Sequence, residues 1–261
     1  MDQTLAHVID LDRHPLADDG FRARCRSHLE RHGSLVLPGF LTARSLDAVR
    51  REGLEKQHLA YYCKQRHNVY LTAPDPGFPV DHPRNRLVNS SKGCITDDQV
   101  SADSPLRVLY DAPDFRSFLC AVLDQEAMHP YADPLSSVNI HYAREGQELG
   151  WHFDNSSFAI TLMIQEPERG GAFEYVRGLR DSANDDMNFD GVRRVLDGEV
   201  RPSVLEMTAG TLVLFRGRDS MHRVTPVAGT GTRMLVVLAY NSKPGIELSE
   251  PARMTFYGRL G

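Results

Sequence analysis

The segment "ELGWHFDNSSFAITLMIQEPERGGAFEY", residues 148–175, places a histidine and an aspartate two positions apart, shortly before an apolar run. In a β-strand the side chains at i and i+2 point to the same face, so His152 and Asp154 converge while Phe153 points to the opposite face. Such a pair belongs either to a metal site or to an ordinary protein surface. Which interpretation holds depends on what the rest of the chain adds to the pair.

The region around this segment has the pattern of a β-sandwich or barrel. Short apolar stretches are separated by turns rich in glycine, proline or charged residues, which predicts a series of strands. The predicted strands cover residues 136–143, 158–165, 172–176, 211–217, 222–227 and 233–241. An insertion at 177–203 interrupts the series, and we expect a short helix near 191–197 within it.

The first half of the chain has mainly helical patterns. A helix is predicted from Asp18 or Asp19 to a stop at Gly33, and a second over residues 42–63 with Thr42 as its cap. A third helix opens at Ala112-Pro113, and its apolar residues recur at helical spacing, which indicates one buried face. These residues are Phe115, Phe118, Leu119, Val122 and Leu123.

Together these patterns predict an α+β fold in which a double-stranded β-helix, the jelly roll also seen in cupins, packs against a helical N-terminal layer. A short strand at 34–41 separates the first two helices. Residues 71–93 are rich in proline, glycine and asparagine and are expected to form a long lid loop. We expect a single domain over residues 1–261, divided into a mainly helical layer (1–134), a strand core (135–242) and a C-terminal tail (243–261).

Composition narrows the classes of function. The chain has 261 residues, 41% of them hydrophobic and 25% charged, with a net charge of −5. This acidic balance lacks the electrostatic signature of a nucleic-acid partner. The longest apolar run, Met234–Tyr240, is too short to cross a membrane, and the first residues lack the apolar region of a secretory signal. Four cysteines without C-x-x-C spacing favour a reducing compartment, so we expect a cytoplasmic protein, and a homo-oligomer is compatible with this composition.

A third candidate metal ligand stands seventy positions after the first pair, where His222 precedes a predicted strand. Two histidines and one carboxylate on one side of an ion form the arrangement typical of non-haem Fe(II) oxygenases. It leaves coordination positions open for a chelating co-substrate and dioxygen. Arg233 follows His222 by eleven residues, across the turn "VAGTG", and its guanidinium suits the far carboxylate of a keto acid bound to the metal.

The combined motif resembles that of the 2-oxoglutarate/Fe(II)-dependent oxygenases over residues 135–242. The matching elements are Tyr142-x3-Gly146-x2-Leu149-x2-His152-x-Asp154, then Gly170-Gly171-x-Phe173, then His222 and Arg233. The layout of the whole chain is most similar to the BesD/HalD-like group of free-amino-acid halogenases and hydroxylases. That similarity includes the helical first half and the stretches "YADPLSS", "GWHF" and "LVLFRGR".

The resemblance implies a specific chemistry. His152, Asp154 and His222 would hold Fe(II), and 2-oxoglutarate would chelate it with its distal carboxylate on Arg233. Dioxygen would then oxidise a C–H bond of a small molecule while 2-oxoglutarate is converted to succinate and carbon dioxide. The halogenases of the group have a small residue, usually glycine, in place of the metal-binding acid, which makes room for chloride. Asp154 stands at that position here, so the resemblance implies hydroxylation, although desaturation or ring formation would use the same site.

Other residues are weaker candidates for contacts with the co-substrate. Asn139 and His141 share a strand face upstream of the metal pair, where related oxygenases place polar groups against 2-oxoglutarate, and a structural role is equally compatible with their positions. Thr161 and Tyr142 are further candidates.

Substrate-binding groups are expected on the segments around the barrel. Arg66 would suit a substrate carboxylate, in a cluster with His67, Asn68 and Tyr70, and Arg84 with Arg86 forms an alternative anion site. Asp133 or Asn155 would suit a substrate ammonium, and Trp151 would line the pocket or simply pack. In lysine-acting members of the group an acid follows the metal motif, so Asn155 at that position argues against lysine as the substrate.

Three alternatives remain at this point. The same ligands would suit a zinc hydrolase or a cupin-type isomerase, which would leave Arg233 without an explanation. A jelly roll can also be a binding module without catalysis. An oxygenase of this kind can act on a protein side chain in place of a small molecule.

Overall fold

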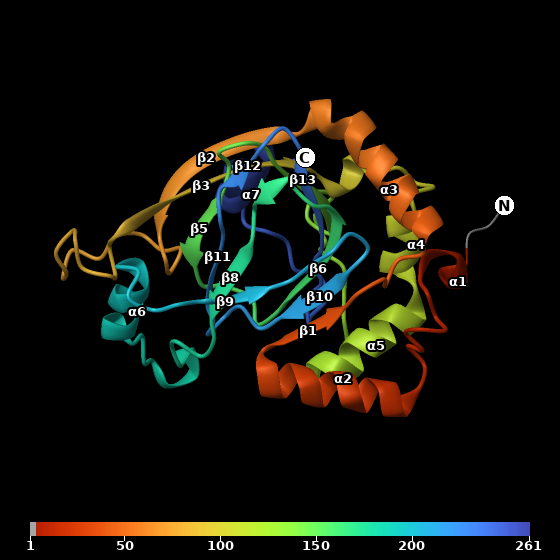
Figure 1. The fold of residues 1–261 in the computed structure, drawn as a ribbon, viewed down its shortest axis with the longest axis horizontal. Helices are drawn as coiled ribbons and strands as arrows, with labels where there is room; N and C mark the ends of the chain where they lie inside the picture. Colours follow the sequence, from red (N-terminus) through yellow and green to blue (C-terminus); the bar gives the residue numbers. More distant parts are fainter. Residues whose placement is uncertain (1–3) are drawn as a thin grey trace.

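A strongly curved antiparallel sheet forms the centre of the computed structural model, which describes residues 4–261 (Figure 1). Ten of its strands follow one another in the order β1-β10-β6-β13-β4-β3-β5-β11-β8-β9, and β2 pairs with β3 at the side. The strands are β1 (Ser34–Leu37), β2 (Tyr61–Asn68), β3 (Leu87–Ile95), β4 (Val138–Ala143), β5 (Leu149–His152), β6 (Ala159–Gln165), β8 (Phe173–Val176), β9 (Ser203–Leu205), β10 (Leu212–Phe215), β11 (Met221–Val224) and β13 (Arg233–Leu238). The predicted jelly-roll fold is confirmed.

Two further strands, β7 (Arg169–Gly170) and β12 (Val227–Ala228), form a separate small sheet. The predicted strands of the second half of the chain are present within a few residues of their expected bounds. The sheet also takes in β1, β2 and β3 from the first 134 residues, so it extends beyond residues 135–242.

Helices cover one side of the curved sheet (Figure 1). This layer consists of α1 (Leu5–Val8), α2 (Asp19–His32), α3 (Ala43–Lys56), α4 (Pro105–Asp111) and α5 (Pro113–Leu123). The predicted caps of α2 and α3 are confirmed, because Asp18 accepts a bond from the Phe21 N–H at 2.6 Å and Thr42 accepts one from the Ser45 N–H at 3.3 Å. The apolar face predicted for α5 is fully buried in the core between the layer and the sheet.

Away from this layer, α6 (Phe189–Leu196) lies in the predicted insertion, and α7 (Glu250–Tyr257) contacts β2 and β3. Three single-turn 3₁₀ helices lie at Gln57–Leu59, Asp97–Gln99 and Ser182–Asn184. Within residues 4–261, none of the helices combines the length and apolarity needed to cross a bilayer.

One predicted helix and one predicted loop are wrong in their bounds. The helix expected over 42–63 ends at Lys56, and its last residues begin β2. The loop expected over 71–93 ends at Arg86, because residues 87–95 form β3 and pair with β2 along its whole length. Hydrogen bonding between β2 and β3 outweighs the helical spacing of the residues in β2. The local sequence pattern does not predict this pairing, because the paired residues are far apart in the chain.

Helix α3 is held close against the outer face of β4 and β13. The Tyr142 hydroxyl donates to the Gly53 carbonyl at 2.7 Å, and a Cβ at Gly53 would lie only 2.4 Å from the Met234 sulfur. Glycine at this position therefore allows the helix to approach two strands whose opposite faces line the interior of the barrel.

We expect Gly53→Leu to destabilise the protein by about 1–3 kcal/mol, because the larger side chain would push α3 away from Met234. Urea unfolding followed by circular dichroism measures the change. Glu55→Leu, at an exposed position of the same helix, is the matched control and should leave the midpoint nearly unchanged. Equal stability of the two variants would contradict the close packing.

Candidate metal centre

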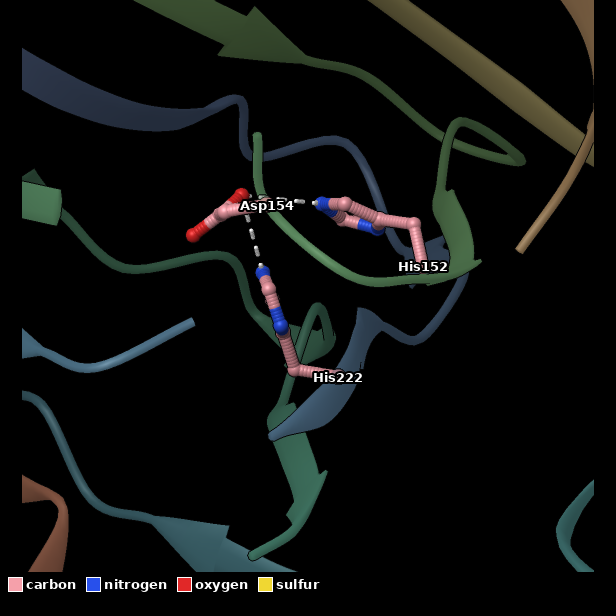
Figure 2. A group of neighbouring side chains, drawn as sticks. All are labelled: His152, Asp154 and His222. Atoms are coloured by element: carbon pink, nitrogen blue, oxygen red, sulfur yellow. Dashed lines mark ion pairs between the residues drawn. The ribbon is translucent and has the colours of Figure 1, made fainter. Parts of the chain in front are cut away.

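Three side chains meet at one end of the barrel interior: His152, Asp154 and His222, here called the triad (Figure 2). His152 ends β5 and His222 lies on β11, and these residues face each other in the antiparallel pairing of the two strands. Asp154 follows two residues after His152. A ring nitrogen of each histidine and a carboxylate oxygen of Asp154 all lie within 4.8 Å of one another. The register of two strands thus brings together residues that are far apart in the chain.

The backbone fixes the orientation of both imidazoles. Nδ1–H of His152 donates to the Gly150 carbonyl at 2.8 Å, and Nδ1–H of His222 donates to the Ser220 carbonyl at 2.9 Å. Each Nε2 is directed toward Asp154 Oδ1, which lies 3.7 Å from Nε2 of His152 and 3.5 Å from Nε2 of His222. A second bond that sets the tautomer and the ring orientation is what metal-binding histidines require.

The electrostatics suit a cation between these groups. Burial, aided by the neighbouring His222, lowers the pKa of His152 to about 3, so this imidazole is neutral at physiological pH. Burial alone would raise the pKa of Asp154, but His222, His152 and Lys92 outweigh it and hold the pKa below its usual value. Asp154 Oδ2 is buried without a hydrogen-bond partner among the described residues. Asp154 Oδ1 faces both Nε2 atoms, and a carboxylate oxygen placed between two oriented imidazoles fits a divalent metal ion.

A cavity of about 300 Å³ opens on the triad and extends into the barrel. Arg233, at the start of β13, lines it and is only 4% exposed. Its Nε and Nη2 have no hydrogen-bond partner among the described residues, and burial lowers its pKa to about 10, which leaves it charged at neutral pH. The cavity therefore holds the triad and an unpaired cation, and such a cation is suited to bind an anionic ligand.

The structure separates the two residues predicted on β4. His141 and Thr161 line the cavity. Tyr142 borders it as well, but its side chain is directed at α3, where the hydroxyl donates to the Gly53 carbonyl. Asn139 does not: its amide donates to the Leu135 and Val138 carbonyls, and its oxygen accepts from the Tyr257 hydroxyl at 2.9 Å. The polar groups of Asn139 are thus used to fix α7 and the start of β4, which corrects the expectation that they face a co-substrate.

None of the five residues predicted to bind substrate lines the cavity. The buried Asp133 carboxylate accepts bonds from the Ser136 hydroxyl and the Leu248 N–H, which gives it a structural role. Asn68 closes a turn by accepting from the N–H groups of Tyr70 and Thr72.

The other three also lie elsewhere. Arg66 is exposed on the outside of β2, and Asn155 is exposed after the triad. Trp151 points away from the triad and packs under the guanidinium of Arg223, 4.8 Å from the ring centre.

The alternative anion site is also occupied by local contacts. Arg86 forms an ion pair with Asp197 and donates to the Leu196 carbonyl, so it attaches the loop to α6. Arg84 donates to the Ala73 carbonyl at 3.2 Å.

Two charged residues of the cavity wall escaped the sequence analysis: Lys92 and Glu148. Lys92 lies in β3 and not in the predicted loop, and Ser90, Lys92 and Cys94 alternate as residues on one face of a strand do. Glu148 has no ion pair or side-chain hydrogen bond among the described residues, and no sequence pattern distinguishes it from a surface acid.

Comparisons with known proteins agree with this architecture. The family model described as Halogenase D matches residues 17–253. No curated protein matches the chain. Among solved structures, a 2OG-Fe(II) oxygenase family oxidoreductase from Burkholderia pseudomallei is similar with 14% identity and a TM-score of 0.54, over 88% of this chain and 95% of that one.

Two other structures are similar in fold. The α-ketoglutarate-dependent carbocyclase SnoK from nogalamycin biosynthesis has 12% identity and a TM-score of 0.59, over 88% of this chain and 89% of that one. HygX from Streptomyces hygroscopicus, solved with nickel, 2-oxoglutarate and hygromycin B, has 17% identity and a TM-score of 0.53, over 85% and 88%. On the family match, which spans nearly the whole sequence, the chain belongs to the Halogenase D family.

Proposed function

We propose that the protein is an Fe(II)- and 2-oxoglutarate-dependent dioxygenase that hydroxylates an unactivated C–H bond of a free amino acid or a close derivative. Succinate and carbon dioxide are the co-products. The observation that carries the proposal is the joint presence, in one cavity, of the triad and the unpaired Arg233. A zinc hydrolase or a binding module gives no reason for a buried, unpaired guanidinium in the same cavity as the triad.

Each residue has a defined task in this proposal. The triad would hold the iron, and Arg233 would bind the distal carboxylate of 2-oxoglutarate. The bound iron and co-substrate supply the oxidation of the C–H bond. The apolar wall, which includes Leu149, Phe158 and Phe173, would position the substrate and exclude water from the reacting groups.

Hydroxylation in place of halogenation rests on Asp154. Its carboxylate lies against Gly217, where an added Cβ would be only 1.8 Å from Oδ2. An acid therefore fills the space beside the metal position that a halide ion would need. This supports a hydroxylase within a family whose model is described as a halogenase.

The charges of the cavity support a zwitterionic substrate. Lys92 and Arg233 are positive, Glu148 and Asp154 are negative, and His152 and His141 are held neutral because burial lowers their pKa values. These charges balance, as would those of Fe(II) and the 2-oxoglutarate dianion. A substrate without net charge then keeps the closed site neutral, and Glu148 is free to accept its ammonium group. A cavity of about 300 Å³ also suits a small molecule better than a protein segment.

The direct test combines binding and turnover. Under anaerobic conditions, Fe(II) and 2-oxoglutarate should together give a charge-transfer absorbance that neither gives alone. Free amino acids are then screened for oxygen-dependent succinate release, and products are identified by mass spectrometry. Turnover that needs neither oxygen nor 2-oxoglutarate would support a zinc hydrolase or isomerase.

We expect Asp154→Gly to weaken Fe(II) binding by at least tenfold and to suppress hydroxylation, because the only carboxylate of the triad is lost. Iron affinity is measured by anaerobic titration, and product by mass spectrometry. Asp103→Gly, in an exposed turn far from the cavity, is the control. Hydroxylation at the wild-type rate by Asp154→Gly would reject Asp154 as a ligand.

Gly217→Ala tests the same carboxylate without removing a candidate ligand. The new methyl must displace Asp154, so we expect Fe(II) affinity to fall about 10- to 100-fold while the fold is kept. Circular dichroism checks the fold, and anaerobic titration gives the affinity. Gly20→Ala, exposed in the first turn of α2, should have no effect. Unchanged metal binding in Gly217→Ala would show that the carboxylate position is unimportant.

A further inference from the structure

Lys92 is a second unpaired cation in the cavity. It lies on β3 and lines the same cavity as the triad and Arg233. Its Nζ is 3.3 Å from His141 Nδ1 and 5.5 Å from the centre of the Phe256 ring. Among the described residues, no carboxylate lies within ion-pair distance of this ammonium group. Desolvation in the cavity lowers the pKa of Lys92, as it does for Arg233.

Strand register places these two cations on either side of one alanine. Arg233 of β13 faces Ala143 of β4, and Gly93 of β3 faces Tyr142 on the other edge of β4. Continuing this antiparallel register by one residue sets Lys92 across from Ala143. Neighbouring strands are about 4.8 Å apart, so the backbones of Lys92 and Arg233 are separated by roughly 10 Å. Both side chains and Ala143 line the cavity, and the alanine methyl leaves the space between the cations open.

His141 completes the group from the same face of β4. Burial and the charges of Lys92 and Arg233 hold its pKa well below the usual value, so it is neutral and can accept a hydrogen bond from the Lys92 ammonium. The Lys92 side chain is thereby held inside the cavity with protons left to donate. A buried guanidinium and a half-buried ammonium that both line one cavity without an ion-pair partner favour an anionic ligand between them.

We propose that Lys92 and Arg233 bind one carboxylate jointly, and that this carboxylate is the distal one of 2-oxoglutarate, held over the Ala143 methyl. The inference rests on the proposed function and adds a specific residue to it. A guanidinium can form two parallel bonds with a carboxylate, and an ammonium on the other side can bond to the remaining lone pairs. The site thus selects a dicarboxylic 2-oxo acid over a monocarboxylic one.

The test compares two 2-oxo acids that differ in this carboxylate. Fe(II)-loaded protein is titrated anaerobically with 2-oxoglutarate and with 2-oxopentanoate, and binding is followed by absorbance. We expect Lys92→Met to raise the Kd of 2-oxoglutarate by about ten- to a hundredfold, since a charge-assisted hydrogen bond is lost. The Kd of 2-oxopentanoate, which has no distal carboxylate, should change less than about twofold in the same experiment.

Two further variants control this experiment. Lys64→Met removes an exposed lysine from the neighbouring strand β2 and should bind both acids as the wild type does. Lys92→Arg keeps the charge and should retain much more 2-oxoglutarate affinity than Lys92→Met. Circular dichroism and Fe(II) affinity, both expected to be unchanged, show that the fold and the triad remain intact.

The outcomes separate this inference from the proposed function. Equal losses for both acids, or no loss for either, would overturn the role of Lys92 while leaving 2-oxoglutarate as co-substrate. A Lys92→Met variant that binds 2-oxoglutarate normally but has a raised KM for the amino acid would assign Lys92 to the substrate and overturn the inference. Wild-type protein that binds Fe(II) but not 2-oxoglutarate would overturn the proposed function and with it this site.

Discussion

The antiparallel pairing of β5 with β11 is the constraint on which the site depends. It sets His152 opposite His222 and so brings the two imidazoles together. Each ring is also held from its own strand, because in both cases Nδ1–H donates to the carbonyl of the residue two positions earlier. The long-range register and the local hydrogen bonds are therefore separate requirements. A shift of the register by one residue would direct one imidazole out of the barrel.

The same sheet concentrates unpaired charge where solvent is excluded. Arg233 and Lys92 approach the cavity from the two strands that flank β4, and Asp154 approaches from the end of β5. Each of these groups alone would be unfavourable in such an environment. The hydrophobic packing of the helical layer against the outer face of the sheet compensates for this and holds the strands in place. The outer face of the sheet therefore packs against the helices and stabilises the fold, while the inner face carries the charged groups that can bind ligands.

Much of this arrangement follows from the sequence. The series of short apolar strands after a helical first half predicts the fold class, and the i, i+2 spacing of His152 and Asp154 with the later His222 predicts the members of the triad. Helix α5 was also predictable, because its five apolar residues recur at helical spacing. The hairpin of β2 and β3 was not, since residues 57–63 continue a helical pattern and only pairing with residues 87–95 makes them a strand.

Because the hairpin of β2 and β3 is not predicted, Lys92 is not predicted to line the cavity. The prediction of the substrate-binding residues was wrong for a related reason. Asp133 and Asn68 have the chemistry of binding groups, but the backbone N–H groups that occupy them come from turns and, for Asp133, from a segment more than a hundred residues away.

The position of Trp151 has a practical consequence. It is the chain's single tryptophan, and it directly precedes His152 in β5 with its indole under the Arg223 guanidinium. All indole emission of the protein thus originates from one buried ring, in the residue that directly precedes His152. Binding of a paramagnetic ion at the triad would quench this fluorescence, so metal binding can be followed without an added label.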